Sequence, residues 1–414
     1  MSTPTPPAAA AVTDPTAGLA VRRGVMLALA TIGFAVNFWA WALLSPLGPR
    51  FKEALGLTPF QQSLLVAVPV IVGALGRIPV GALTDRYGGR IMFPVVSFTT
   101  IIPVLFIGYV GNTSFAGLLL GGFFLGVAGT AFAVGVPFVN AWFPPERRGL
   151  AIGVFGAGMG GTAISALTTV KLVNRYSVAT PFLVTAVVLL AYGVIAAVVL
   201  RDAPGRRLPT GSLAHRLGST ARLPLTWQAS ALYAIAFGGY VAFSVYLPTY
   251  LKSAYSLTPA DAANRMAGFV LLAVLMRPVG GYLSDRFTST NVLTIALAVV
   301  AAGAGVQALT PALYPVATAA FLTMAAALGA GSGATFALVA ERAPAGQVGS
   351  VTGIVGAAGG LGGFVPPLIM GSLYGRYGDY GAGLAALAVV ALAGAVFTAT
   401  VVRRSPAEGT PVAV

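Results

Sequence analysis

The sequence predicts an all-α membrane protein with twelve transmembrane helices arranged as two pseudo-symmetric six-helix bundles. Of its 414 residues, 57% are hydrophobic and only 8% are charged, whereas about 25% of the residues of a soluble domain are charged. The hydrophobic residues form twelve long runs, and the last six runs repeat motifs of the first six. Helices are the natural way to cross a bilayer with such runs, because a helix satisfies its backbone polar groups internally.

Each of the twelve runs has about 20 residues or more, which is enough to span the hydrocarbon core. The candidate spans are residues 25–45, 62–84, 91–110, 114–140, 148–172, 179–200, 226–251, 262–284, 290–309, 313–339, 347–373 and 380–402. The 53 glycines and 28 prolines of the chain are compatible with this assignment. Glycine allows transmembrane helices to pack closely, and a bundle can satisfy the backbone groups that proline frees.

The net charge of +14 follows the predicted topology. If the N-terminus is cytoplasmic, the cytoplasmic face receives Arg22, Arg23, Arg86, Arg90, Arg147, Arg148, Arg201, Arg206, Arg207, Arg216, Arg222, Arg286, Arg342, Arg403 and Arg404. The opposite face receives Arg50, Lys52, Arg175, Lys252, Arg265 and Arg376. Cytoplasmic loops carry the excess of Lys and Arg in membrane proteins. We therefore expect a multi-pass protein of the cytoplasmic (inner) membrane with both termini in the cytoplasm.

This topology divides the chain into five segments. Residues 1–20 are rich in Pro, Ala and Thr and lack the features of a signal peptide, so we expect a disordered cytoplasmic tail. The other segments are an N-terminal six-helix bundle at 21–200, a cytoplasmic linker at 201–225, a C-terminal six-helix bundle at 226–404 and a cytoplasmic tail at 405–414. The chain contains no cysteine, which excludes disulfides and thiolate metal sites.

The two halves share motifs at a constant offset. The stretch "RIPVGALTDRYGGR" returns two hundred residues later as "RPVGGYLSDRF", and "GLAIGVFGAGMGG" returns as "GSVTGIVGAAGG" at the same offset. The matched pairs include Arg77 with Arg277, Gly81 with Gly281, Asp85 with Asp285, Arg86 with Arg286, and Thr58-Pro59 with Thr258-Pro259. The stretch "GTAFA" at 129–133 corresponds to "GATFA" at 333–337. Parallel repeats of this kind are typical of secondary transporters, whose substrate site lies near the midplane between the repeats.

The paired arginines lie deep in their spans. Arg77 precedes Asp85 by eight residues, which places it about 12 Å deeper in the membrane at about 1.5 Å per helical residue. A charged side chain at that depth costs at least about 2.5 kcal/mol and is therefore a functional-site hypothesis. A structural arginine bonded to backbone carbonyls is the alternative interpretation. The matched placement of Arg277 in the second half favours a functional pair.

The ten acidic residues leave the two arginines without a neutralising carboxylate at the same depth. All ten fall in tails, loops or helix ends: Asp14, Glu53, Asp85, Glu146, Asp202, Asp261, Asp285, Glu341, Asp379 and Glu408. We therefore expect the substrate itself to be the counter-ion. Planar guanidinium groups suit a small planar oxyanion, because they bind it bidentately and stack on aromatic faces. Nitrate, nitrite, bicarbonate and small carboxylates all meet this description.

Two motifs resemble those of a known family. Residues 81–90 resemble the loop 2–3 motif of the major facilitator superfamily, and residues 277–286 are a degenerate copy. The stretch "GSVTGIVGAAGGLGGFVPP" at 349–367 resembles the glycine-rich eleventh-helix signature of nitrate/nitrite porters. The resemblance covers nearly the whole chain and implies the major facilitator fold. It also implies that Arg77 and Arg277 bind the substrate anion.

The same resemblance implies a set of residues around the anion. The aromatic candidates are Phe132, Tyr233, Phe237 and, as the pseudo-symmetric counterpart on helix 10, Phe336. The glycine candidates are Gly160, Gly161, Gly359 and Gly360, from clusters that also allow helices 5 and 11 to slide against their neighbours. One departure bears on the substrate: the fifth-helix signature usually carries asparagine at Gly161 and glycine at Ala163.

Other charged residues are expected to act outside the substrate site. The candidates for gating or for tethering helices at the cytoplasmic surface are Asp85, Arg86, Arg90, Asp285 and Arg286. Lys171 lies eleven residues after Gly160, about three helical turns, so it shares the face of Gly160. It either faces the outward half of the cavity and attracts anions, or extends its side chain to the outer surface.

These features predict a secondary transporter that moves nitrate, nitrite or both by alternating access. Proton symport usually relies on intramembrane Asp, Glu or His, and the predicted spans lack these residues, which favours nitrate/nitrite exchange. Proton-coupled nitrate symport and exchange of small carboxylates are the alternatives. Efflux of cationic drugs would need a buried carboxylate, and an anion sensor would need an appended soluble signalling domain.

The sequence contains no recognisable catalytic nucleophile, metal-ligand cluster or phosphate loop. We therefore expect neither enzyme activity nor a cofactor or metal. The expected partners are the small anion and the lipid bilayer, without nucleic acid, and the chain is expected to act as a monomer in nitrate assimilation.

Overall fold

The computed structural model describes residues 15–204, 218–344 and 348–405, and within these ranges it contains helices and no β-strand. Twelve helical spans are long and apolar enough to cross a membrane. Those of the first half are α1 (Pro15–Trp41) with α2 (Leu44–Leu55), α3 (Pro59–Leu75) with α4 (Arg77–Tyr87), α5 (Gly89–Tyr109), α6 (Phe115–Leu125) with α7 (Ala131–Trp142), α8 (Pro145–Gly156) with α9 (Gly161–Arg175), and α10 (Ala179–Val199). Those of the second half are α12 (Pro224–Tyr255), α13 (Pro259–Phe287), α14 (Ser289–Ala308), α15 (Thr318–Arg342), α16 (Val348–Tyr377) and α17 (Gly381–Thr400). The predicted fold class is confirmed.

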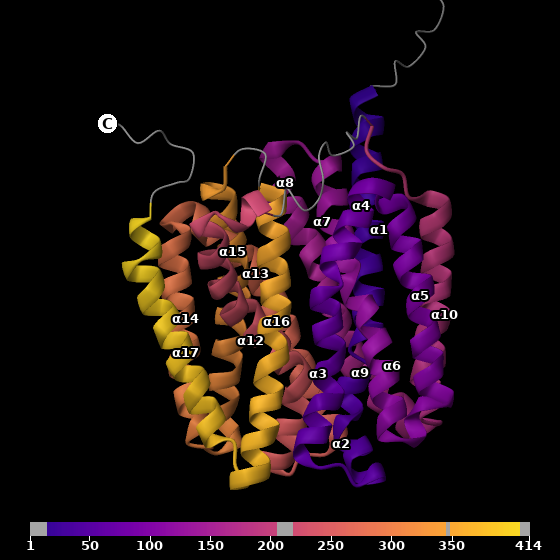
Figure 1. Ribbon diagram of the computed structural model, residues 1–414, viewed down its shortest axis with the longest axis vertical. Helices are drawn as coiled ribbons and strands as arrows, with labels where there is room; N and C mark the ends of the chain where they lie inside the picture. The colour runs from indigo at the N-terminus through magenta and orange to yellow at the C-terminus, as the bar shows by residue number, and fades with distance from the viewer. Residues whose placement is uncertain (1–14, 205–217, 345–347, 406–414) are drawn as a thin grey trace, which may run out of the picture.

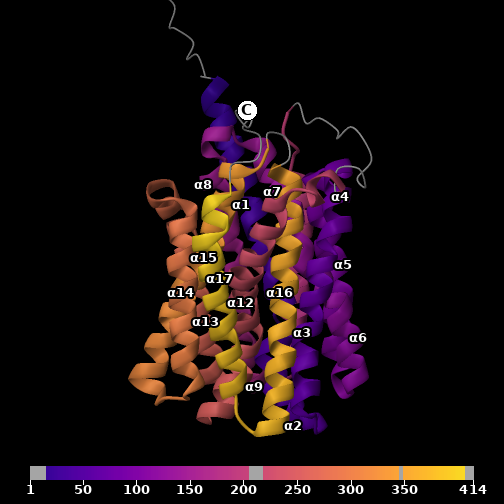
Figure 2. The same ribbon diagram turned by 60° about the vertical axis from the view of Figure 1, so that its left-hand side comes forward.

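The helices form two bundles that lie side by side, with α1 to α10 in indigo and magenta and α12 to α17 in orange and yellow (Figure 1). Within the second bundle α12 packs on α16, α13 on α15 and α14 on α17, and within the first α5 packs on α10. Between the bundles α3 lies against α16, as Figure 2 also shows, and α9 lies against α13. The 200-residue offset relates α3 and α4 to α13, and α8 and α9 to α16. The two interface contacts are therefore copies of each other.

The two ends of the bundles are named here by the helices that finish at them. We call the end at which α10 and α17 finish the linker end, and the end at which α2 finishes the distal end (Figure 1). Short 3₁₀ segments join α6 to α7 at Gly126–Thr130 and α8 to α9 at Ala157–Gly160. Both segments lie in the middle of a span, where they place backbone groups near the interface between the bundles.

The repeat extends to helix capping. The hydroxyl of Thr58 caps α3 by accepting a hydrogen bond from the backbone N–H of Gln61 at 3.2 Å, and the backbone N–H of Thr58 donates to Oε1 of Gln61 at 2.9 Å. Thr258 caps α13 in the same way, accepting from the N–H of Asp261 at 3.2 Å. A threonine at this position satisfies one of the unpaired N–H groups of the first turn. The matched Thr-Pro pairs therefore start equivalent helices.

The repeat also extends to unusual backbone conformations. Gly56 and Ser256 have φ values of 63° and 55°, and Gly88 and Thr288 have φ values of 85° and 74°. Positive φ is accessible to glycine without a steric penalty, whereas a side chain is strained there. The second half keeps the turn geometry of the first although a serine and a threonine have replaced the glycines.

Candidate functional site

Arg77 is the first residue of α4, in the middle of the second span, and its side chain is 8% exposed. Its Nη1 donates a hydrogen bond of 2.7 Å to the backbone carbonyl of Gly356, which lies on α16 of the other bundle. Its Nε donates to the carbonyl of Gly129 in its own bundle at 3.4 Å. The guanidinium group therefore bridges the interface between the bundles.

Arg277 lies in the middle of α13 and is 9% exposed. Its Nη2 donates a hydrogen bond of 2.8 Å to the hydroxyl of Tyr233 on α12, within its own bundle. Its Nη1 lies 2.6 Å from the Sδ atom of Met159, which belongs to the other bundle. Arg277 therefore bridges the same interface, with side-chain acceptors where Arg77 has backbone carbonyls.

The two guanidinium groups share a neutral environment. All four of their acceptors are uncharged, and neither group forms an ion pair with a carboxylate among the side chains that the structure describes. Buried charges in proteins are normally paired or ligand-bound, because an isolated charge is costly in an apolar medium. The arrangement therefore offers two buried cations without a carboxylate counter-ion among the described residues.

The ring of Phe237 lies between the two arginines. Its centroid is 5.7 Å from the Cζ atom of Arg77 and 5.5 Å from the Cζ atom of Arg277. These distances allow cation–π attraction to both groups. Phe237 on α12 therefore partly offsets the cost of holding two like charges in one site.

The other three predicted aromatic residues also surround the arginines. The ring of Phe132 is 5.2 Å from the Cζ atom of Arg77, and the ring of Phe336 is 5.6 Å from the Cζ atom of Arg277. These two phenylalanines are the counterparts in "GTAFA" and "GATFA". Tyr233 stacks on Phe237 with centroids 4.7 Å apart. The structure thus brings Phe132, Tyr233, Phe237 and Phe336 together.

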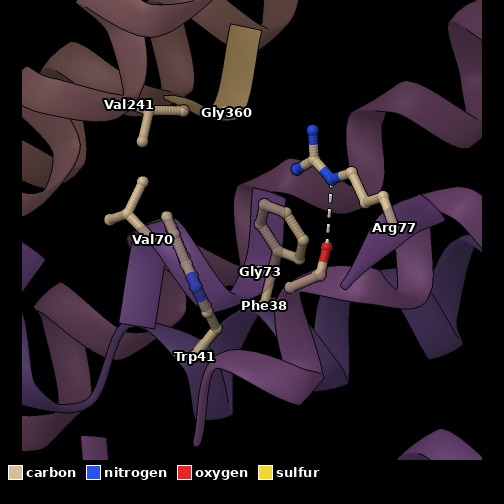
Figure 3. A pocket seen from close by; sticks show the side chains of 8 residues that line it. Phe38, Trp41, Val70, Gly73, Arg77, Val241 and Gly360 are labelled. Atoms are coloured by element: carbon tan, nitrogen blue, oxygen red, sulfur yellow. Dashed lines mark hydrogen bonds between the residues drawn. The ribbon is translucent and has the colours of Figure 1, made fainter. Parts of the chain in front are cut away.

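A small cavity of about 10 Å³, roughly the space of one water molecule, lies beside Arg77. Its lining residues are Phe38, Trp41, Val70, Gly73, Arg77, Gly129, Val241 and Gly360. In Figure 3, Phe38, Trp41 and Val70 come from the first bundle, whereas Val241 and Gly360 come from the second. The indole N–H of Trp41 is already bonded to the carbonyl of Pro69 at 3.0 Å. Arg77 therefore provides the charge of a cavity that is otherwise mostly apolar.

The sequence reasoning missed the contribution of the first span. Phe34, Phe38 and Trp41 follow one another at intervals of four and three residues and are all buried. This spacing places them on one face of a helix, so the aromatic pattern was available as a signal. Met159 was missed as well, and nothing in its sequence context identifies it as a neighbour of Arg277.

The four predicted glycines have different surroundings. A Cβ atom on Gly360 would lie 3.4 Å from Nη1 of Arg77, and one on Gly359 would lie 2.3 Å from the ring of Tyr233, so both glycines adjoin the site. A Cβ atom on Gly160 would meet no atom within 4 Å. A Cβ atom on Gly161 would lie 1.9 Å from the backbone oxygen of Ala35 on α1. The absence of a side chain at Gly161 therefore allows α9 to approach α1 closely.

The predicted gating residues lie away from the arginine pair, toward the linker end. The backbone N–H of Arg90 donates to Oδ1 of Asp202 at 3.3 Å. Arg86 and Arg286 are exposed and lie beside the neighbouring rings of Tyr87 and Phe287. Asp285 is exposed, whereas the side chain of Asp85 lies outside the described part of the structure. Lys171 is exposed on α9, in agreement with a side chain that extends to the surface.

Polar contacts join the two bundles at the distal end. Glu53 on α2 forms an ion pair with Lys252 on α12. The amide of Gln62 donates to the hydroxyl of Thr249 at 3.0 Å. The hydroxyl of Ser45 donates to the carbonyl of Val245 at 2.7 Å. These three contacts hold the two bundles together at the distal end.

The functional groups of the site are suited to binding a ligand. It offers guanidinium groups, aromatic faces and one phenolic hydroxyl. In the part of the chain that the structure describes, no group of three or more His, Cys, Asp or Glu side chains is placed to hold a metal ion. Such a set of donors can hold a small anion through hydrogen bonds and charge.

Comparisons with known proteins agree with this fold. The family model of the Major Facilitator Superfamily matches residues 30–365 and 229–413. The chain is 50% identical over 349 residues to "Probable nitrate/nitrite transporter NarK2" of Mycobacterium tuberculosis (strain ATCC 25618 / H37Rv), covering 84% of this chain and 88% of that protein. It is 35% identical over 358 residues to the "Nitrite extrusion protein" of Bacillus subtilis (strain 168), covering 85% and 88%. It is 33% identical over 296 residues to "Probable nitrate/nitrite antiporter NarK1" of Thermus thermophilus, covering 68% and 66%.

A solved structure has the same fold. It is a bacterial homologue of the human lysosomal transporter Spinster in an inward-facing and occupied conformation, with a TM-score of 0.73 and 18% identity over 92% of this chain and 97% of that one. Together with the twelve spans, the repeat-related bundles and the relatives named above, this result confirms the predicted family: the chain belongs to the major facilitator superfamily and, within it, to the nitrate/nitrite porters, which makes it a transporter and not an enzyme.

Proposed function

We propose that this protein exchanges nitrate for nitrite by alternating access, with the anion bound between Arg77 and Arg277. The observation that carries the proposal is the pair of buried guanidinium groups, one from each bundle, without a carboxylate partner among the described side chains. One monovalent anion between them offsets one of the two positive charges and makes charge-assisted hydrogen bonds with both groups. The names of the relatives, two nitrate/nitrite transporters and a nitrite extrusion protein among them, support the identity of the anion.

The shape of the site supports a small planar substrate. Guanidinium groups present their donors in a plane, and aromatic faces stack on planar groups. Phe237 lies within cation–π distance of both arginines, and Phe132 and Phe336 flank one arginine each. A flat anion can lie against these rings while its oxygens meet the N–H groups. Gly360 leaves room for the approach of the two bundles, because a Cβ atom there would meet Ala74 of the first bundle, and Gly359 leaves room for the ring of Tyr233. Gly160 is assigned to the same site.

The distal contacts support a rocking movement of the two bundles. The bonds of Glu53, Gln62 and Ser45 to the second bundle close the distal end. They have to open when the site is exposed on that side. Each arginine also bonds to the opposite bundle. The anion site and the bundle interface are therefore the same structure, which is what alternating access requires.

The coupling follows from the absence of a proton carrier. The acidic residues of the spans, Glu53, Asp261 and Asp285, lie within three residues of a span end, and the middle of each span carries no Asp, Glu or His. Proton relays usually use these residues. An anion must therefore occupy the site on the return step, which is exchange. Proton-coupled nitrate symport, in which another group carries the proton, and exchange of small carboxylates are the competing functions.

The charge distribution supports the remaining assignments. We place the linker end, with both termini and the linker 201–225, in the cytoplasm and the protein in the cytoplasmic membrane, because the linker end is rich in arginine. The functional unit in this proposal is a monomer of two six-helix bundles, 21–200 and 226–404, with a small anion and the bilayer as its partners. Asp85, Arg86, Arg90, Asp285 and Arg286 form its cytoplasmic gate.

Counterflow in proteoliposomes tests the proposal. Vesicles loaded with nitrite should take up labelled nitrate without a pH gradient, and uptake should slow when the internal anion is removed. Vesicles without protein and vesicles with an Arg77→Ala, Arg277→Ala double variant provide the baseline. Uptake into anion-free vesicles that depends on an inward proton gradient would establish symport. Uptake that is competed by oxalate but not by nitrite would establish a carboxylate exchanger.

A further inference from the structure

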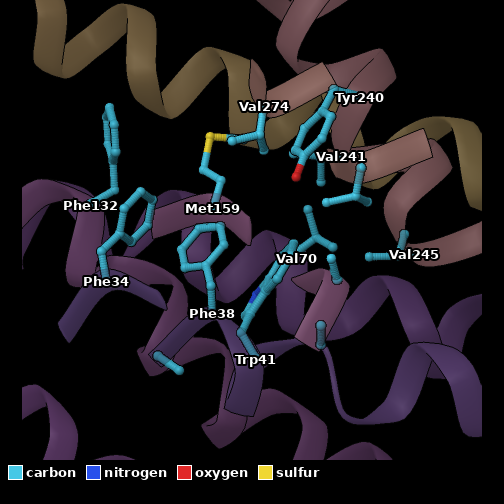
Figure 4. Packing of buried hydrophobic residues seen from close by; sticks show 14 of the residues in the cluster. Phe34, Phe38, Trp41, Val70, Phe132, Met159, Tyr240, Val241, Val245 and Val274 are labelled. Carbon is cyan, nitrogen blue, oxygen red and sulfur yellow. The ribbon is translucent and has the colours of Figure 1, made fainter. Parts of the chain in front are cut away.

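Met159 lies where a substrate anion would meet Arg277. Its side chain is 3% exposed, and its Sδ atom is 2.6 Å from Nη1 of Arg277 across the bundle interface. Figure 4 shows the thioether extending from the first bundle toward Val274 of α13, with the ring of Phe38 drawn below it. We propose that Met159 is an internal substitute for the anion, which occupies Arg277 in the unloaded transporter and competes with the substrate.

The chemistry of the four acceptors selects Met159 as the one that the anion displaces. A thioether is a weak acceptor, whereas carbonyl and hydroxyl oxygens are strong ones. A bond from a guanidinium group to an anionic oxygen joins two charged partners, whereas its bond to Sδ of Met159 has a neutral and weak acceptor. Replacing Sδ of Met159 by an anion oxygen therefore stabilises the complex more than replacing the hydroxyl of Tyr233 or a backbone carbonyl would.

The local structure allows this movement. Met159 lies in the 3₁₀ segment Ala157–Gly160, next to a glycine whose Cβ position meets no atom within 4 Å. Methionine is unbranched and has three rotatable side-chain bonds. The thioether therefore has the torsional freedom to leave Arg277 once an anion takes its place.

The repeat shows that the contact belongs to one half of the site. The residue equivalent to Met159 in the second half is Gly359. A side chain at Gly359 would lie 2.3 Å from the ring of Tyr233, so this position holds no competitor for Arg77. Arg77 is held instead by the carbonyl of Gly356, which belongs to α16. The anion can thus replace a side chain at Arg277, whereas Arg77 gives up its partner when the bundles move.

The inference rests on the proposed function, since it needs nitrate or nitrite as the ligand. Two variants of similar size test it. Met159→Leu removes the acceptor and leaves an N–H group of Arg277 free for the anion, so nitrate should bind more tightly. Met159→Gln provides a stronger neutral acceptor, so nitrate should bind more weakly. Each dissociation constant should change by about two- to tenfold, the value of one hydrogen bond.

Isothermal titration of the purified full-length protein in detergent with potassium nitrate measures both changes. A packing role for Met159 would weaken binding in both variants, whereas the proposal requires changes in opposite directions. Met324→Leu is the matched control, because Met324 is fully buried on α15 against Gly303 and should leave the dissociation constant unchanged.

The outcomes separate this inference from the proposed function. If the wild type binds nitrate and Met159→Leu binds it equally or more weakly, the inference is wrong and the proposed function stands. Met159→Leu decides the matter alone if Met159→Gln does not fold. If the wild type binds neither nitrate nor nitrite, both the proposed function and this inference fall.

Discussion

Arg77 donates from Nη1 to the carbonyl oxygen of Gly356 in the opposite bundle at 2.7 Å. The repeat partner of Gly356 is Gly156, whose Cβ position lies 3.9 Å from the Cδ atom of Arg277. Each arginine thus packs against a glycine of the opposite bundle, and the two glycines are related by the repeat. Small residues at this position allow the side chain of an arginine to approach the helix backbone. Movement of one bundle against the other therefore changes the contacts of both arginines together.

Lysine at either arginine position should lower transport. Arg77→Lys and Arg277→Lys keep the positive charge but lose the planar set of donors, and a lysine cannot bind an oxyanion bidentately. We expect the rate of nitrate/nitrite exchange in proteoliposomes to fall by at least about tenfold in each variant, equivalent to about 1.4 kcal/mol. Membrane insertion and folding should be preserved.

Alanine variants and a surface control complete this experiment. Either single alanine variant should be nearly as inactive as the double variant, because one arginine alone cannot hold the anion. Arg86→Lys, at an exposed arginine near the linker end, should have a smaller effect. Exchange at the wild-type rate by both lysine variants, at normal expression, would show that the arginines are structural.

The sequence alone predicted the spans and the arginine pair because these features are periodic or repeated. Hydropathy identifies a span from about 20 consecutive residues, and the 200-residue offset identified Arg277 from Arg77. The four aromatic residues came from the resemblance to a family. Their contacts with the guanidinium groups depend on how α4, α7, α12, α13 and α15 pack, and this packing has no local signature.

The rest of the site depends on which helices meet. The contact of Met159 with Arg277 joins residues 118 positions apart in different bundles. The distal ion pair of Glu53 with Lys252 joins residues 199 positions apart. Neither pair shares a motif, so only the packed structure reveals them. The sequence likewise could not show that Gly161 packs against the backbone of α1, because close packing and anion binding both favour a small residue.

The contrast between Gly161 and its neighbour predicts a difference in stability. Gly161→Ala should destabilise the protein by about 1–3 kcal/mol, the usual cost of overpacking, because the new methyl group would meet the backbone of Ala35. Gly160→Ala places the same methyl group in open space and should have little effect. Thermal unfolding of the two variants in detergent, followed by intrinsic fluorescence, measures the difference. Equal midpoints would mean that α1 and α9 do not approach as closely as described.

Thr288 offers a stabilising substitution. Its φ of 74° is strained for a residue with a side chain, and the equivalent position in the first half is Gly88. Thr288→Gly should relieve about 1–3 kcal/mol of strain, of which up to about 1 kcal/mol is offset by the greater freedom of glycine in the unfolded chain. We expect a higher unfolding temperature in detergent. Thr290→Gly, within the first turn of α14, should lower it, and a lower midpoint for Thr288→Gly would contradict the strain.

The ion pair of Glu53 with Lys252 should control access to the site from the distal end. Because the chain has no cysteine, Val241→Cys places a single thiol in the wall of the cavity beside Arg77. Lys252→Met in this background removes one of the bonds that close the distal end. A membrane-impermeant maleimide is applied from the distal side. We expect it to modify the thiol at least about threefold faster than in the Val241→Cys protein with Lys252 intact, a factor that corresponds to the upper range of the free energies of exposed ion pairs.

A charge-matched control separates the loss of this bond from the loss of a positive charge. Lys171→Met removes the same charge from an exposed lysine on α9 and should leave the rate of modification unchanged. Nitrate bound between the bundles should slow the reaction in all of these variants, because the anion and the arginines then occupy the cavity. If the thiol reacts at the same rate in the Lys252→Met and Lys171→Met backgrounds, the ion pair does not restrain the distal opening, and the bonds of Gln62 and Ser45 to the second bundle are sufficient to keep it closed.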